Sequence, residues 1–324
     1  MECLTHSRNH FSIVWGVKYN VRNTKGTLIL VLAALIWGVA FVAQTSAGDS
    51  VGAFTFNAAR SFVGVIFLVA VIAVRGGKGK QNRKNTGTSR SEKRNIIGGL
   101  ACGGALFCAA NFQQFGINIY PDGVAVAGRA GFLTATYVVM VALCDRLFGK
   151  KLHPLVLVSA AGCVAGMYML CLSGGLSGIY LGDAMILCCA VCFTGHIMII
   201  DRFADADGIK MSCVQFAVCG VLSLACALIF ERPHIGELLD AWIPILYTGV
   251  MSSGVAYTLQ IVGQKYAEPA VASIAMSLES VFSAIAGWVI LNERLSAREL
   301  TGCALVFAAV ILAQVPSFLK KKKA

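Results

Sequence analysis

Long apolar segments follow one another along most of this chain, and they constrain its fold more than any other feature. A helix needs about 20 mostly apolar residues to cross roughly 30 Å of hydrocarbon. The segments do not alternate as barrel strands do, so each must satisfy its backbone hydrogen bonds as a helix. The predicted fold is an all-α integral membrane protein with ten transmembrane helices, at 26–46, 51–74, 96–118, 122–144, 152–173, 179–200, 211–230, 242–263, 269–291 and 299–316.

The composition agrees with a membrane as the main solvent. Hydrophobic residues make up 57% of the chain and charged residues only 13%, whereas a soluble domain carries about 25% charged residues. The mean hydropathy is +0.74. Nearly all of the 13 cysteines fall in or beside apolar spans, where a thiol behaves as a small hydrophobe. We therefore predict neither a disulfide framework nor a metal site.

The formal net charge of +11 reflects orientation in the membrane and does not indicate a nucleic-acid partner. With the N-terminus inside, 22 Lys and Arg residues lie in the tails and inner loops, and the outer loops hold only Arg232, Arg294 and Arg298. Such an excess marks the cytoplasmic side. We expect a multi-pass protein of the cell membrane with both termini in the cytoplasm. The basic residues of 75–94 and of the Lys320–Lys323 tail are either solvated or in contact with anionic membrane lipid.

The segments outside the spans have simple expected roles. Residues 1–25 are predicted to form a cytoplasmic N-terminal tail and residues 317–324 a basic C-terminal tail. The stretch 75–95 is rich in Gly, Ser, Thr, Asn and Lys, which is typical of a flexible linker.

Two halves of the chain, 26–173 and 179–316, show signs of internal repetition. A shift of 148 residues places Asp145-Arg146-Leu147 on Glu293-Arg294-Leu295, and a shift of 147 places Gln113 and Gly116 on Gln260 and Gly263. Each half contains five predicted spans, and an odd number makes the second half enter the membrane in the opposite direction. The pattern predicts two inverted five-helix repeats.

Three stretches carry a resemblance to a known family: Leu35–Phe41, Val126–Val139, and Ser277–Phe282 followed by Asn292–Leu295. They resemble the EamA repeats of the drug/metabolite transporter superfamily, over residues 26 to about 316. The resemblance implies ten helices in two inverted repeats and secondary transport, commonly export, of metabolites, amino acids or drugs.

Three ionisable residues lie well inside predicted spans: Arg60, Arg129 and Glu279. A charge at that depth costs about 2.5–3.5 kcal/mol on the insertion scale, so it usually faces the bundle interior or a wet cavity. We expect all three to share one central cavity. Either arginine could bind a substrate carboxylate or phosphate, and Glu279 could carry a coupling proton. The alternative is an internal Arg–Glu pair that locks the helices together.

Polar and aromatic side chains supply further candidates for substrate binding. Two repeat-related spans carry polar residues at i, i+3 and i+7: Asn111, Gln114 and Asn118 in one, and Tyr257, Gln260 and Gln264 in the other. The alternative for these stripes is hydrogen bonding between helices, worth about 0.6 kcal/mol each.

Two aromatic residues and one histidine complete the candidate set. Trp37 and Tyr137 could form an aromatic wall of the cavity, or simply pack. His196 is a second candidate for proton transfer, with a structural hydrogen bond as the alternative.

Motifs of common enzymes are absent from the sequence. It contains no G-x-x-x-x-G-K-[ST] phosphate loop, no H-E-x-x-H and no G-x-S-x-G, so we expect neither catalytic residues nor a cofactor. The favoured function is secondary transport by alternating access, with export of a small organic, amino-acid-like metabolite or a drug. Uptake or exchange by the same fold, a membrane-embedded enzyme and a scaffold are the alternatives. Small-residue spacings such as Gly99 to Gly103 also permit a homodimer face.

Overall fold

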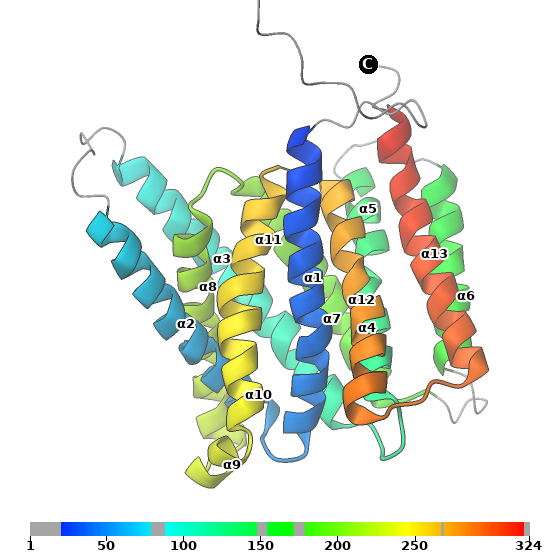
Figure 1. Ribbon diagram of the computed structural model, residues 1–324, viewed down its shortest axis with the longest axis horizontal. Coiled ribbons are helices and arrows are strands. Elements are labelled where there is room, and N and C mark those ends of the chain that lie inside the picture. Colours follow the sequence, from blue (N-terminus) through cyan, green and yellow to red (C-terminus); the bar gives the residue numbers. More distant parts are fainter. Residues whose placement is uncertain (1–20, 79–87, 148–153, 172–178, 267–268, 321–324) are drawn as a thin grey trace, which may run out of the picture.

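The computed structural model describes residues 21–78, 88–147, 154–171, 179–266 and 269–320, and its regular structure in these ranges is entirely helical (Figure 1). Most of the expected N-terminal tail, the middle of the expected linker and the last residues of the basic tail lie outside the described residues. The start of α1 and the end of α13 lie at the same end of the bundle (Figure 1).

Every predicted span coincides with a helix or with adjoining helices. The helices in chain order are α1 (Val21–Gly48), α2 (Ala53–Lys78), α3 (Thr88–Asn118), α4 (Val126–Ala135), α5 (Tyr137–Leu147), α6 (Pro154–Cys171), α7 (Leu181–Arg202), α8 (Gly208–Phe230), α9 (Ile235–Asp240), α10 (Trp242–Tyr247), the π-helix η2 (Thr248–Ala256), α11 (Tyr257–Gln264), α12 (Pro269–Leu291) and α13 (Ala297–Lys320).

Six stretches of the described residues are long and apolar enough to cross a membrane: 25–48, 53–75, 91–118, 181–202, 208–230 and 242–264. Two shorter apolar helical stretches, Val126–Val141 and Ala275–Leu291, accompany them. Many large apolar side chains are exposed on the bundle surface, among them Ile66, Val191 and Trp288. A surface of that kind is suited to contact with lipid.

The helices α2 and α3 extend further than the sequence predicted. The stretch 75–95 was expected to be a linker, but α2 continues to Lys78 and α3 begins at Thr88. The first turns of α3 contact the connection between α7 and α8. Arg94 Nη2 lies 2.6 Å from Asp205 Oδ1, and the Arg94 guanidinium lies 5.3 Å from the centre of the Phe203 ring. These contacts stabilise a charged helical extension that hydropathy alone does not reveal.

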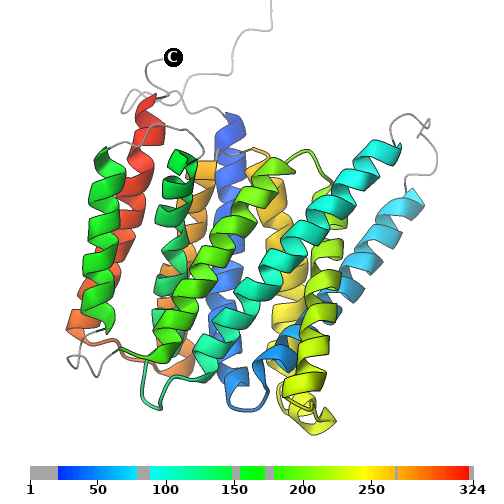
Figure 2. The same cartoon turned by 180° about the vertical axis from the view of Figure 1, so that it is seen from behind.

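Corresponding helices of the two halves pack against each other. The helix α6 packs on α13, and α2 packs on α8, as both views of the bundle show (Figures 1 and 2). Glycines allow two equivalent close approaches between the halves. A Cβ atom at Gly182 would lie 2.7 Å from the carbonyl oxygen of Gly116, and one at Gly26 would lie 3.1 Å from that of Gly263. The third helix of each half therefore approaches the first helix of the other half in the same way.

Candidate functional site

A small cavity lies at the centre of the bundle, with a volume of about 40 Å³. Helices of both halves contribute to its wall. Its lining residues are Trp37, Ala40, Phe41, Gln44, Arg60, Gln113, Thr134, Tyr137, Phe193, Ile197, Ser252, Tyr257, Gln260, Met276 and Glu279. Six of the sequence candidates are therefore brought together: Trp37, Arg60, Tyr137, Tyr257, Gln260 and Glu279.

Arg60 projects from α2 and is almost completely buried. Its Nη1 lies 3.5 Å from Gln44 Oε1, and its guanidinium lies 5.7 Å from the centre of the Phe56 ring. Its Nε has no hydrogen-bond partner. Among the described residues, no carboxylate lies within 4.0 Å of Arg60. An unpaired buried charge costs several kcal/mol, so this guanidinium is suited to receive an anionic group.

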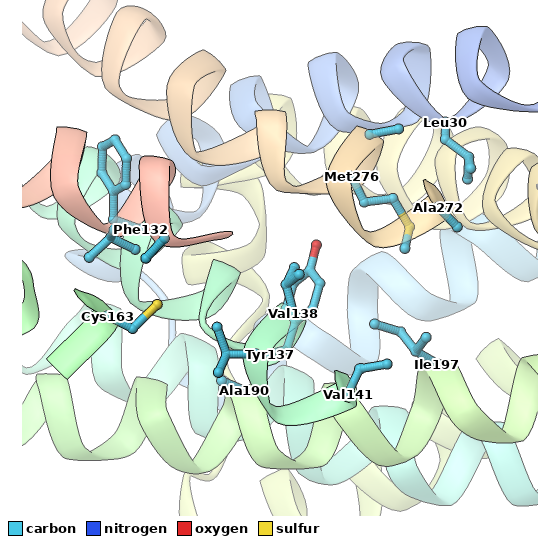
Figure 3. Packing of buried hydrophobic residues seen from close by; sticks show 14 of the residues in the cluster. Leu30, Phe132, Tyr137, Val138, Val141, Cys163, Ala190, Ile197, Ala272 and Met276 are labelled. Atoms are coloured by element: carbon cyan, nitrogen blue, oxygen red, sulfur yellow. The ribbon is translucent and has the colours of Figure 1, made fainter. Parts of the chain in front are cut away.

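Glu279 projects from α12 and is also buried. Tyr137 lines the same cavity. Figure 3 shows the Tyr137 side chain pointing from α5 toward α12, which carries Met276. The Oε1 atom of Glu279 has no partner. Glu279 therefore retains an acceptor for a proton or for a cationic group.

The aromatic part of the wall is formed by Trp37 and Tyr257. Their ring centres are 4.9 Å apart and their planes meet at 67°. The indole Nε1 of Trp37 and the Oε1 of Gln260, on the same wall, both lack partners. Ser252 reaches the wall from the π-helix η2. Such π-helical segments are frequent at functional sites.

His196 lies behind this wall and does not line the cavity. Its Nε2 lies 3.2 Å from Gln215 Oε1, and its ring centre lies 5.8 Å from that of Tyr257. The Nδ1 of His196 is buried without a partner. This candidate therefore contacts two rings of the cavity wall, Tyr257 and Phe193, but does not line the cavity itself.

Arg129 does not share the cavity, contrary to the expectation that the three buried charges would meet there. It forms a two-point ion pair with Asp183: Nε lies 2.6 Å from Oδ1 and Nη2 lies 2.7 Å from Oδ2. Its guanidinium also lies 4.9 Å from the centre of the Tyr180 ring. The pair joins α4 to the start of α7. Asp183 lies inside the predicted span 179–200 but is not among the residues selected from the sequence. A carboxylate in an apolar span is itself a signal of a buried polar partner.

Asn111 and Gln114 are also placed outside the cavity, where they connect helices. Asn111 accepts a hydrogen bond from Asn57 Nδ2 at 3.0 Å and donates one to Ser223 Oγ at 3.1 Å. Gln114 Nε2 donates to the Gln44 carbonyl oxygen at 3.0 Å. Both residues therefore make hydrogen bonds between helices, which was the alternative to substrate binding.

Several lining residues were not selected from the sequence, and one of them carried a usable signal. Gln113 lines the cavity, donates to Thr134 Oγ1 at 3.2 Å and matches Gln260 under the repeat shift of 147. Gln260 lies on the same wall. The repeat therefore marks a pair of cavity residues, whereas the polar stripe favours the neighbouring Gln114.

Comparisons with known proteins agree with this architecture. The EamA-like transporter family matches residues 24–172 and again residues 180–314. An "Uncharacterized transporter" of Archaeoglobus fulgidus is 28% identical over 92% of this chain and 88% of its own length. The "Uncharacterized inner membrane transporter YedA" of Escherichia coli is 23% identical over 88% of this chain and 89% of its own.

A solved crystal structure shares the fold, with a TM-score of 0.66 and 20% sequence identity. The match covers 90% of this chain and 97% of the chain in that structure. The two family matches extend over the described bundle, including the helices that enclose the cavity. This chain is a multi-pass membrane protein that belongs to the EamA-like transporter family.

Proposed function

We propose that this protein is a secondary transporter that exports a small organic solute bearing both a carboxylate and an ammonium group. The single observation that carries the proposal is the presence of Arg60 and Glu279 on the wall of one cavity, with no carboxylate within 4.0 Å of Arg60 among the described residues. A solute carboxylate would bind the guanidinium, and a solute ammonium group would bind Glu279. An α-amino acid has both groups on one carbon atom.

The proposed architecture has ten membrane spans in two inverted five-helix repeats, with both termini in the cytoplasm. Two broken spans enter the count as single crossings: α4 with α5, and α10 with η2 and α11. Five crossings in each half give the halves opposite orientations. The equivalent contacts of α3 with α7 and of α11 with α1 support this arrangement.

Alternating access is supported by the size of the cavity. A water molecule needs about 10–15 Å³ of such volume, so about 40 Å³ holds roughly three waters. Sites for organic ligands usually measure about 300–1,000 Å³. Binding of an organic solute would therefore require the cavity to widen.

Ion pairs join the two halves of the chain at both ends of the bundle. At the end where α1 begins, Arg94 of the first half pairs with Asp205 of the second. At the opposite end, Arg129 pairs with Asp183. Opening toward either side requires contacts at that end to break, which agrees with movement of one repeat against the other.

Transport assays in proteoliposomes test the proposal. Vesicles containing purified protein are loaded with labelled amino acids, and efflux is measured for zwitterionic solutes, their methyl esters and their deaminated acids. The zwitterions should be transported fastest, because each analogue lacks one of the two charges. Arg60→Lys keeps a charge but loses the planar fork, so it should lower zwitterion transport at least tenfold.

Matched variants far from the cavity serve as controls. Arg75→Lys changes an exposed arginine at the end of α2, and Glu237→Gln changes a partly exposed glutamate of α9. Both should transport like the unchanged protein. Equal transport of the zwitterions and both analogues would contradict the proposed substrate class, and the absence of any efflux or exchange would contradict transport of these solutes.

A further inference from the structure

A second, larger hollow lies at the outside of the bundle, where α4, α12 and α13 meet. Its volume is about 510 Å³, and most of its wall is apolar. Ile285, Trp288 and Leu300 line it, and all three are more than half exposed. Gly128 leaves room at its base, because an added Cβ atom would come no closer than 3.5 Å to Ala284. The hollow is thus an apolar groove on a surface that faces lipid.

The helix pair α6–α13 explains why this groove exists. The helix α13 packs extensively on α6 but has few contacts with α12 and α4. Both views show this pair standing beside the rest of the bundle (Figures 1 and 2). The connection from α12 to α13 closes one end of the groove with Glu293, Arg294 and Leu295.

The carboxylates near the groove already have partners. Glu293 accepts hydrogen bonds from the backbone N–H groups of Ala127 at 2.9 Å and Gly128 at 3.4 Å. Glu299 accepts from the Ser296 N–H at 2.9 Å and from its hydroxyl at 2.7 Å, and lies 3.8 Å from Arg129 Nη1. Their negative charges are therefore compensated within the protein.

Two exposed arginines near this end of the groove are not compensated in this way. Arg294 lines the groove, whereas Arg298 is outside its lining, at the start of α13, and lies 6.0 Å from the centre of the Tyr168 ring of α6. Among the described residues, no carboxylate lies within 4.0 Å of either guanidinium. The outward charge at the end of the groove is consequently positive.

We propose that this groove binds one anionic phospholipid, with an acyl chain along α12 and the phosphate at Arg294, and that the exposed Arg298 nearby adds to the positive charge that attracts the headgroup. The apolar wall excludes a purely soluble anion as the preferred occupant. The arginines select an anionic headgroup over a zwitterionic one, because the positive charge of a choline group cancels the attraction of its phosphate. Trp288 lies in the groove and can report the bound chain.

Tryptophan quenching by brominated lipid tests the proposal. The full chain is reconstituted in vesicles that contain increasing fractions of brominated phosphatidylglycerol or brominated phosphatidylcholine. Subtraction of the Trp288→Phe signal isolates the emission of Trp288. This emission should be quenched at a lower fraction of the anionic lipid. A basic residue near a membrane surface contributes about 1 kcal/mol, which corresponds to about fivefold in preference.

Variants connect that preference to the groove. Arg294→Gln with Arg298→Gln should remove most of the preference for phosphatidylglycerol, whereas Arg232→Gln, at an exposed arginine away from the groove, should leave it unchanged. Gly128→Leu should fill the groove and reduce quenching by both lipids. Circular dichroism checks that each variant is folded. If Gly128→Leu does not fold, the double variant Arg294→Gln with Arg298→Gln tests the proposal without it.

Three outcomes would overturn the lipid site. The first is equal quenching of Trp288 by the two lipids. The second is a preference that survives the double arginine substitution. The third is release of the brominated lipid by soluble glycerol 3-phosphate, which would show that a headgroup alone is bound.

Discussion

The two arginines that are buried among the described residues, Arg60 and Arg129, have opposite surroundings, and these surroundings separate their roles. Arg129 is held by both oxygens of Asp183 and lies against the Tyr180 ring. Among the described residues, the contacts of the Arg60 guanidinium are the Gln44 amide oxygen at 3.5 Å and a cation–π contact with Phe56. A satisfied pair stabilises one arrangement of helices, whereas an unsatisfied guanidinium gains most when a ligand arrives.

The Arg129–Asp183 pair should therefore matter for stability. Removing one partner of a buried pair costs about 3–5 kcal/mol, because the other charge stays buried. Asp183→Asn should lower the thermal unfolding midpoint in detergent clearly, and Arg129→Gln combined with Asp183→Asn should be less destabilising than the sum of the two. Strictly additive losses would show that the two side chains act independently.

Glu279 should couple transport to protons. Its carboxylate lines the cavity together with Tyr137, and its Oε1 has no hydrogen-bond partner among the described residues. Glu279→Gln is nearly isosteric but can neither release a proton nor pair with a solute ammonium group, so solute exchange should fall and the exchange that remains should no longer be accelerated by a pH gradient. The ratio of efflux with and without the gradient in proteoliposomes measures this. An unchanged ratio would mean that the proton, if any, is carried elsewhere.

At the scale of elements, hydropathy predicted where the spans lie but not how they are broken. The span 122–144 divides at Thr136, and the span 242–263 contains the π-helix η2. No proline or glycine lies next to Thr136, whereas η2 has Gly249 as its second residue and follows Pro244 of α10. A window of about 20 residues averages over both breaks. Arg60 and Glu279 could be selected from the sequence, because the free-energy cost of placing a charge inside a span is the same on every face of the helix.

The face of a helix was harder to predict. Gln113 and Gln114 are neighbours on α3, yet only Gln113 lines the cavity, while Gln114 bonds the Gln44 carbonyl oxygen of α1. A polar stripe shows that one face meets polar partners. It does not show whether those partners are a cavity or another helix.

The α12–α13 connection caps the start of α4 and should stabilise it. Burial raises the pKa of Glu293, and hydrogen bonds from the backbone of Ala127 and Gly128 oppose that rise. Loss of such a cap costs about 0.5–2 kcal/mol, so Glu293→Ala should lower the thermal midpoint, while Glu293→Gln, which keeps an acceptor, should lower it less. Equal losses in the two variants would assign the effect to packing.

The raised pKa also fixes the sign of the pH dependence. Below the unfolded pKa, Glu293 is protonated in both states, and its contribution to stability is fully present. As pH rises through the higher folded pKa, the folded state must ionise a buried carboxyl, and stability is lost. The glutamine variant should lack this loss in thermal melts measured across the same pH range.

At the scale of the whole molecule, the bundle geometry and the distribution of Lys and Arg must imply the same orientation in the membrane. The connection between α7 and α8 lies at the same end as the termini, and α9 lies at the opposite end (Figure 1). The excess of Lys and Arg is on the first of these sides. A reporter fused after Asp205, which is exposed, should therefore be active in the cytoplasm.

A second reporter, fused after the exposed Gly236 in α9, should be active only outside the cytoplasm. The two positions lie on opposite sides of α8, so they must differ whatever the absolute orientation. Exchanged signals would reverse the whole protein, place the Arg294 and Arg298 groove in the cytoplasmic leaflet and turn proposed export into uptake under the same gradient. Identical signals would instead mean that α8 does not cross the membrane, which would contradict the ten-span architecture itself.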